Sequence, residues 1–226
     1  MIKKNFKLSM TQVLNPAVVA LAEAHLAAVD KVMAGLIAAH GPCPLGSCAR
    51  LDLEPDLSGG SPEGNQRIDP FADLASSIVS QQLSDRAAST ILGRVLTRIG
   101  KLTPKAVLAA KVEDLRAAGV SGPKVRYLKA LAEAVQSGEL DFTSFEGQSS
   151  EEVIAALTRV PGIGRWTAEM FLIFVLGHSD VLSLGDAGLK RAARKLYGEK
   201  KELASVGRKW RPYSSVASWY LWRHLD

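Results

Sequence analysis

Hydrophobic positions recur at helical spacing along most of this 226-residue chain. Apolar residues three and four positions apart form one buried face of a helix, whereas a half-buried strand alternates apolar and polar residues. No stretch longer than four residues alternates here, so we predict an all-α fold of about ten helices. The predicted helices cover residues 16–39, 70–81, 84–99, 112–118, 122–137, 153–160, 165–174 and 187–197, with shorter ones after 103, near 201–210 and over 213–224.

Local signals mark where several of these helices begin. Asp69 before Pro70 is a typical N-cap, followed by the proline that the first helical position tolerates. Ser149 and Glu152 have the spacing of a capping box, which satisfies two backbone N–H groups at a helix start. Residues 41–67 are rich in Gly, Pro and Ser, so we expect a long loop there.

A tight glycine turn follows Pro161, which ends the preceding helix because proline lacks an N–H and disfavours helix in the residue before it. Gly162 and Gly164 can turn with positive φ and leave no side chain between the backbone and a ligand. The turn directs N–H groups at the start of the next helix, which suits a phosphate oxygen. A plain helical hairpin explains the two glycines equally well, and Gly119 to Lys124 forms a second turn of this kind.

Positive charge is concentrated near the end of the chain. The net charge is +5, yet residues 186–226 hold ten Lys and Arg against four acidic residues, which leaves −1 for the first 185 residues. A basic segment of this kind is an electrostatic footprint for nucleic acid or another acidic surface, with a solvated helix face as the alternative. The 47% hydrophobic content is typical of a globular protein with a substantial core.

The two cysteines, Cys43 and Cys48, lie in a loop rich in Pro and Gly. Two thiols are too few for a four-cysteine iron–sulfur cluster, and they do not by themselves complete a tetrahedral zinc site. We expect free thiols in a reducing compartment, with a local redox disulfide as the alternative. Pro16 and charged residues interrupt the apolar run after the basic N-terminus, so we expect no signal peptide or membrane span and a cytoplasmic location.

Three separated motifs occur in order: Gln81-Gln82-Leu83-Ser84, then Pro161-Gly-Ile-Gly-Arg-Trp-Thr-Ala168, then Gly185-Asp186 at the start of the basic helix. With these motifs, residues 68–224 resemble the helix-hairpin-helix (HhH-GPD) DNA glycosylase superfamily, and within it the 3-methyladenine DNA glycosylase II family. The resemblance implies a two-lobed all-α fold, with the active cleft between the lobes and without the N-terminal β domain of some members. Lobe A would span about 75–185, with the hairpin at 153–176, and lobe B about 1–74 plus 187–226, in one glycosylase unit over 1–226.

Asp186 is the predicted catalytic residue. Its position at the start of a helix is that of an N-cap, and a simple capping role is the alternative, although one carboxylate can do both. The helix macrodipole stabilises an anion there, and N-glycosidic cleavage needs an anion because positive charge develops on the deoxyribose ring. The resemblance implies that Asp186 either stabilises the oxocarbenium-like sugar or deprotonates the attacking water. Asp180 is a weaker candidate.

The resemblance also implies a base pocket formed by Trp166, Met170 and Tyr213. Electron-rich rings stack on bases, and more strongly on a base that alkylation has made cationic. Met170 stands where some members have an aromatic residue, and Ser214 stands where the family's C-terminal Trp-x-Pro-x-Arg-Ser-x-Ala segment has arginine. Both departures suggest a more open or less aromatic pocket. Core packing is the alternative role for Trp166.

For DNA binding, the resemblance makes Leu83 the wedge that fills the gap left by an extruded base, with Gln82 against the orphaned base. The alternative is that Leu83 is a core residue and the glutamines are linkers. Contacts to the DNA backbone are expected from amide and basic groups of Gly162, Gly164, Arg165, Lys124, Lys190 and Arg191. The resemblance further implies a Na or K ion at the hairpin carbonyls of residues 160–164; we expect no side-chain metal site and no other cofactor.

No lysine lies between Lys129 and Lys190, and arginine cannot supply the neutral amine with which strand-cutting members form an imine. We therefore predict a monofunctional glycosylase of base excision repair. It would flip alkylated purines of the 3-methyladenine and 7-methylguanine type out of double-stranded DNA and hydrolyse the N-glycosidic bond, acting as a monomer. Three alternatives stay open: a non-catalytic helix-hairpin-helix DNA-binding or damage-sensing protein, a glycosylase for oxidised or mispaired bases, and an interaction scaffold.

Overall fold

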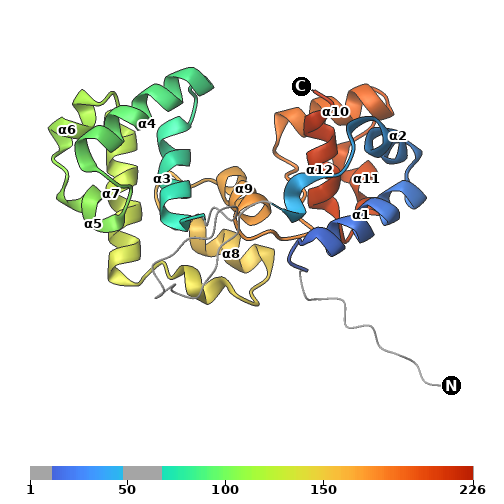
Figure 1. Cartoon of the computed structure of the whole chain (residues 1–226), viewed down its shortest axis with the longest axis horizontal. Helices are drawn as coiled ribbons and strands as arrows, with labels where there is room; N and C mark the ends of the chain where they lie inside the picture. The colour runs from blue at the N-terminus through green and yellow to red at the C-terminus, as the bar shows by residue number, and fades with distance from the viewer. Residues whose placement is uncertain (1–11, 48–67, 226) are drawn as a thin grey trace. The chain divides into compact units, whose positions relative to one another are not determined.

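The structure is a computed structural model that describes residues 12–47 and 68–225 (Figure 1). Its helices fall into two compact units: of the described residues, unit 1 holds 12–47, 146–152 and 177–225, and unit 2 holds 68–145 and 153–176. The described residues form twelve α-helices and no strand, apart from an isolated bridge between Val13 and His178. None of these helices is long and apolar enough to cross a membrane. The prediction of an all-α fold is confirmed.

Unit 1 packs N-terminal helices against C-terminal ones. Its elements are α1 (Pro16–Val29), α2 (Lys31–His40), η1 (Pro44–Gly46), α10 (Ala187–Tyr197), α11 (Leu203–Gly207), η3 (Arg208–Trp210) and α12 (Ser214–Arg223). The last helix, α12, contacts α1, α2 and α10. Leu26, Met33, Trp210 and Tyr220 are fully buried, and removing such large side chains from water is the main stabilising contribution.

Unit 2 is built around α7 (Gly122–Ser137), which contacts α3 (Pro70–Ser80), α5 (Pro104–Ala109) and α6 (Val112–Ala117). Its other elements are α4 (Asp85–Ile99), η2 (Phe142–Phe145) and α9 (Arg165–Phe174), while α8 (Ser150–Leu157) begins in unit 1 and ends in unit 2. Leu128 of α7 and Phe171 of α9 are buried in its core. This core fixes the helices that carry the predicted wedge and hairpin.

The predicted caps are present at two helix starts. Asp69 Oδ1 accepts the Ala72 N–H at 3.0 Å at the start of α3. Before α8, the Ser149 N–H and hydroxyl both donate to Glu152 Oε2, at 2.8 and 2.6 Å, which completes the capping box. These ends depend on residues three positions apart, so the sequence alone was enough to predict them.

The single helix predicted over residues 16–39 is wrong, because Asp30 divides it into α1 and α2. Asp30 has extended backbone angles, φ −146° and ψ 107°, and its Oδ1 caps α2 by accepting the Val32 N–H at 3.0 Å. Its Oδ2 accepts hydrogen bonds from the Tyr197 hydroxyl at 2.7 Å and from Trp210 Nε1 at 2.8 Å. One buried carboxylate thus joins α2 to α10 and η3, which helical periodicity does not reveal.

The boundaries of the units differ from those of the expected lobes. All of α3 lies in unit 2, so the expected boundary near residue 75 falls inside a helix. Residues 177–185 lie in unit 1 rather than with the hairpin. The Leu14 N–H donates to the Gly177 carbonyl at 2.7 Å, and the Ser215 hydroxyl donates to the His178 carbonyl at 2.6 Å. Hydrogen bonds to N- and C-terminal residues therefore hold this link in unit 1.

Candidate active site and DNA-binding elements

Asp186 is the N-cap of α10 in unit 1. Its Oδ1 accepts the Leu189 N–H at 2.7 Å and the Trp222 Nε1–H at 3.1 Å. The residue is 8% exposed, so its charge lies in a mostly dry setting where electrostatic interactions are stronger than in water. The two N–H donors and the macrodipole of α10 stabilise the anion there. One carboxylate therefore caps the helix and offers a fixed negative charge.

Trp222 of α12 contacts Asp186, and the sequence analysis did not identify it as a candidate. Gly188 lies close to both side chains. A Cβ at residue 188 would lie 3.1 Å from Asp186 Oδ1, which is tighter than most Cβ contacts, and 3.4 Å from Trp222 Cδ1, which is ordinary van der Waals contact. The glycine two positions after Asp186 was therefore the available sequence signal that a side chain packs over the start of α10.

Asp180, the weaker catalytic candidate, has a structural role in unit 1. Its Oδ1 accepts the Ser214 hydroxyl at 2.5 Å and the Ser214 N–H at 3.4 Å, at the start of α12. Its Oδ2 pairs with Arg211 Nε at 2.9 Å. Ser214 is buried, so the serine that stands in place of the family's arginine belongs to the packing at the start of α12.

The outer face of α10 is basic. Leu189, Ala192 and Ala193 are buried, whereas Lys190, Arg191, Arg194 and Lys195 are exposed. The four cations form two pairs at i, i+4 spacing along one side of the helix. They supply the kind of charge that a phosphate backbone attracts independently of sequence.

The predicted pocket residues are divided between the two units. In unit 1, Tyr213 directly precedes α12, is half-buried and makes an edge contact with the His25 ring, with 5.5 Å between centroids. In unit 2, Trp166 lies in the first turn of α9 and is 48% exposed, so it is not a core residue. Met170 and Phe174 follow Trp166 at intervals of four residues, so the three side chains share one face of the helix. Phe174 is 38% exposed, and the sequence analysis did not select it. This apolar stripe has the chemistry to stack on a base.

The hairpin turn (residues 160–164) between α8 and α9 uses its two glycines differently. Gly162 has φ 91°, and a Cβ there would lie 2.4 Å from the Tyr127 ring, so the fold requires glycine. Gly164 has φ −88°, which suits any residue, and a Cβ there would meet no atom within 4 Å. Gly164 therefore leaves the start of α9 open to an approaching group. Beside it, Arg165 Nε pairs with Glu169 Oε1 at 3.0 Å.

The wedge turn (residues 81–84) lies between α3 and α4. Leu83 is 37% exposed, which excludes the core role that was its alternative. Gln82 is also exposed, and among the described residues it is the one non-glycine with positive φ, at 59°. This left-handed conformation costs about 1 kcal/mol for an L-residue, and such strain clusters at functional sites.

Lys124, expected at the DNA backbone, makes two internal hydrogen bonds. Its Nζ donates to the carbonyls of Val79 and Gln81, both at 2.7 Å. Gln81 in turn donates Nε2 to the Gly162 carbonyl at 2.9 Å. The structure thus brings the wedge turn and the hairpin turn together inside unit 2.

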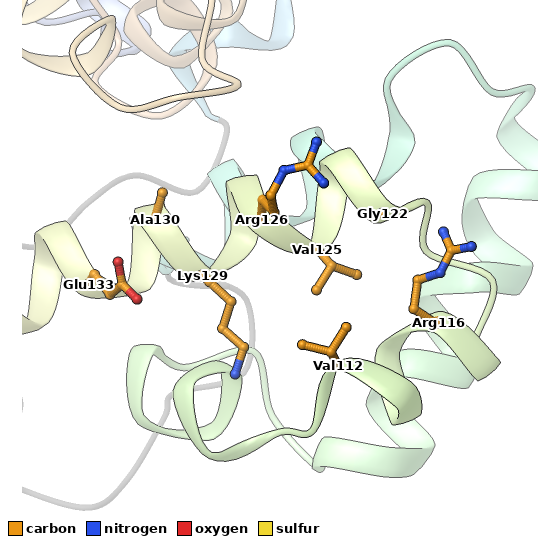
Figure 2. Close-up of a pocket in the computed structure, with 8 residues that line it drawn as sticks. All are labelled: Val112, Arg116, Gly122, Val125, Arg126, Lys129, Ala130 and Glu133. Atoms are coloured by element: carbon orange, nitrogen blue, oxygen red, sulfur yellow. The ribbon is translucent and has the colours of Figure 1, made fainter.

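A groove of about 460 Å³ lies between α6 and α7 of unit 2 (Figure 2). Figure 2 shows Val112 and Val125 facing each other across it, and Arg116 and Arg126 also line it. None of the predicted site residues lines this groove, so it is not part of the predicted site.

The described residues hold no group of three or more His, Cys, Asp or Glu side chains that could bind a metal ion. Cys43 is buried, and its backbone N–H donates to Glu23 Oε1 at 2.8 Å. Cys48 and residues 49–67 of the expected loop lie outside the described residues. The state of the two thiols stays a prediction.

A known protein family matches the part of the chain that holds these elements. A family model described as HhH-GPD superfamily base excision DNA repair protein matches residues 75–208. The chain belongs to the HhH-GPD superfamily. The matched span holds the wedge turn, the hairpin turn and Asp186, while Tyr213 and Trp222 lie beyond it.

Several known proteins are similar to this chain over most of its length. An alkylbase DNA glycosidase-like protein of Schizosaccharomyces pombe is 30% identical over 212 residues, which are 89% of this chain and 92% of that protein. The solved structure of a DNA-3-methyladenine glycosidase from Bacillus halodurans has 38% identity and a TM-score of 0.74, and covers 92% of this chain and 88% of that chain. A Schizosaccharomyces pombe 3-methyladenine DNA glycosylase, solved in complex with abasic DNA, has 32% identity and a TM-score of 0.70 over 90% and 95% of the two chains.

Proposed function

We propose that this HhH-GPD protein is a monofunctional DNA glycosylase that excises alkylated purines from damaged duplex DNA. Fungal and bacterial proteins similar to it are named DNA-3-methyladenine glycosylase or glycosidase, and one was solved with abasic DNA, which is what base release leaves. The observation that carries the proposal is Asp186, a mostly buried carboxylate held by two N–H donors at the start of a basic helix.

Asp186 acts on the sugar in this proposal. As the bond between C1′ and the purine breaks, its electron pair leaves with the base and the deoxyribose becomes positively charged. A fixed carboxylate in a low-dielectric setting stabilises that charge without reorganisation. Water then adds its oxygen to C1′ and loses a proton. A purine methylated at N3 or N7 already carries positive charge and departs as a neutral base, so the reaction needs no proton donated to it.

In this proposal the protein binds DNA as a monomer. The amides of the hairpin turn and the cations of α10 contact the DNA backbone, and Leu83 is the wedge. A Na or K ion at the hairpin carbonyls is part of the same proposal. The Val160 carbonyl accepts the Ile163 N–H at 3.1 Å, and the Gly162 carbonyl accepts the Gln81 amide. Because a carbonyl oxygen has two lone pairs, both oxygens fit a role as cation ligands. When bound, the ion would supply positive charge for a phosphate.

The substitution Asp186→Asn tests the proposal, because asparagine also caps helices and should keep the fold. The wild-type protein should release methylated purines from duplex DNA treated with a simple alkylating agent. The variant should lose about 100-fold or more in single-turnover rate, as when one stabiliser of transition-state charge is removed, while its DNA affinity stays close to wild type.

Asp180→Asn is the matched control, since that carboxylate caps α12 and pairs with an exposed arginine. It should release bases within about threefold of wild type, because exposed ion pairs contribute little. Release by Asp186→Asn at the wild-type rate would remove Asp186 from the mechanism. A wild-type protein that binds methylated duplex but releases no base would favour the non-catalytic DNA-binding alternative. Borohydride trapping of a covalent DNA adduct would contradict the monofunctional assignment.

A further inference from the structure

Lys124 of α7 joins the end of α3 to the wedge turn. Its ammonium donates to the Val79 carbonyl in the last turn of α3 and to the Gln81 carbonyl in the wedge turn, each at 2.7 Å. Carbonyls at a helix C-terminus have no partner within the helix, and their partial negative charge attracts cations. Lys124 therefore satisfies two such groups and holds the first residue of the wedge turn.

This position is unfavourable for a lysine within its own helix. Lys124 lies in the first turn of α7, where the macrodipole repels a cation. Burial also lowers the pKa of its ammonium, because the charged form loses hydration. The two carbonyl contacts favour the charged form and direct the ammonium to the end of α3 and the wedge turn.

Gln81 and α7 connect the wedge turn to the hairpin turn. The Gln81 Nε2 donates to the Gly162 carbonyl at 2.9 Å. One turn after Lys124 on α7, Tyr127 packs so closely on the hairpin that a Cβ at Gly162 would lie 2.4 Å from its ring. Lys124 thus contacts one turn, Tyr127 the other, and Gln81 closes a triangle of contacts in unit 2.

The wedge turn itself is short and constrained. The Leu83 N–H donates to the Ser80 carbonyl at 3.1 Å, and Gln82 between them has φ 59°. An exposed leucine on such a turn keeps a fixed direction when both ends of the turn are held. The contacts of Lys124 and Gln81 are at its first residue, and Ser84 starts α4 as its cap.

We propose that Lys124 and Gln81 are positioning residues for base extrusion, and this rests on the proposed function. They hold the wedge turn at a fixed distance from the hairpin turn. When the hairpin binds a backbone phosphate, Leu83 is then in register with the base step that it must enter. Loss of either contact leaves the catalytic carboxylate intact but lets the wedge shift, and a shift of about 1 Å can reduce a rate by up to two orders of magnitude.

Lys124→Met tests this inference, and α7 supplies a matched control. Lys129 Nζ also donates to two carbonyls at a helix end, those of Leu108 and Ala110, at 2.8 and 2.7 Å. Lys129→Met therefore removes the same charge and the same number of hydrogen bonds away from the wedge turn. Gln81→Met is a second test variant, which removes the amide donor at nearly constant volume.

The variants are compared by single-turnover release of a methylated purine from a fully paired duplex and from the same strand with the purine unpaired. Lys124→Met should be at least about tenfold slower than Lys129→Met on the paired duplex and within about twofold of it on the unpaired strand, because an unpaired base needs no extrusion. Gln81→Met should change in the same direction. Equal rates for Lys124→Met and Lys129→Met on the paired duplex, or equal losses on both substrates, would overturn the inference.

Base extrusion is also measured without chemistry, from the fluorescence of 2-aminopurine beside the lesion in an Asp186→Asn background. Lys124→Met should lower the rise in fluorescence on binding, and Lys129→Met should not.

The slope of log affinity against log salt should be the same for both variants, since a lost phosphate contact would reduce the slope by about one for Lys124→Met alone. Such a loss would make Lys124 a phosphate ligand instead. A wild-type protein that unstacks the base but releases none would refute the proposed function and leave the positioning role standing.

Discussion

Asp30, Asp180 and Asp186 each lie beside a helix start in unit 1, yet their partners differ. Asp30 is buried among a tyrosine, a tryptophan and a lysine, and its contacts join three elements. Asp180 accepts a hydrogen bond from Ser214 at the start of α12 with one oxygen and pairs with the exposed Arg211 through the other. Asp186 accepts hydrogen bonds from a backbone N–H and an indole N–H at the start of a basic helix. Three similar carboxylates therefore have three roles, which depend on what surrounds each one.

Trp222→Phe separates the indole donor from the ring at the same position. The variant loses the Nε1–H that donates to Asp186 Oδ1 at 3.1 Å but keeps most of the apolar packing. A hydrogen bond to a charged group contributes about 1.5–3 kcal/mol, so base release should fall by roughly tenfold to 100-fold in single-turnover assays. Trp219→Phe on the same helix is the control, since that ring packs edge-on against Tyr220 at 4.9 Å. Equal rates for the two variants would show that the indole N–H does not matter for turnover.

At the scale of elements, unit 2 contains two helix–turn–helix segments with similar turns. Gly119 before α7 has φ 102° and Gly162 before α9 has φ 91°. The residue after each is buried, Val120 in one turn and Ile163 in the other. Next comes an N-cap with extended angles and no side-chain hydrogen bond. The local rule is shared, but Gly164 is the N-cap with nothing near its Cβ position.

Gly162→Ala should mainly lower stability, whereas Gly164→Ala should mainly lower DNA affinity. At residue 162 the new Cβ would collide with the Tyr127 ring, and alanine would be forced to keep a positive φ. The free energy of unfolding should therefore fall by about 2 kcal/mol or more. At residue 164 the fold should change by less than about 1 kcal/mol, while DNA affinity falls because a methyl group obstructs the amides. Urea unfolding and DNA titration measure the two effects. Undiminished DNA binding by a folded Gly164→Ala protein would contradict a role for the open turn.

At the scale of the whole molecule, polar burial is well compensated. Every buried side-chain nitrogen or oxygen in the described residues has a hydrogen-bond partner. One such contact joins distant parts of the unit 1 chain: the Ser150 hydroxyl lies 3.0 Å from His178 Nδ1. Burial lowers the pKa of His178 from 6.5 to about 4, because the charged imidazolium would lose its hydration. The fold therefore holds this histidine in its neutral form.

The lowered pKa of His178 predicts a pH dependence of stability. Above pH 6.5 the imidazole is neutral in the folded and unfolded chains, so it adds no pH dependence. Between pH 6.5 and about 4 the unfolded chain binds a proton that the folded chain resists, so stability falls, by roughly 3 kcal/mol in total. His178→Gln, which cannot titrate, should lose this component in urea unfolding measured from pH 7 to 4. Parallel pH profiles for the two proteins would contradict it.

The sequence by itself determined the all-α class, most helix boundaries and the glycine turn, because these depend on residues within one or two turns of each other. Caps such as Ser149 with Glu152 lie three positions apart and are visible in any reading of the chain. The family resemblance further selected Asp186, Leu83 and the hairpin as site residues, and the matched span holds all three.

The tertiary structure decided what depends on residues far apart in the chain. Asp30 interrupts an apolar helical pattern because its carboxylate bonds to Trp210, 180 positions later. Trp222 reaches Asp186 across 36 positions, and Lys124 reaches Val79 across 45. No local rule contains such pairs, since a side chain's partners are set by which helix faces pack together and not by the order of residues along them.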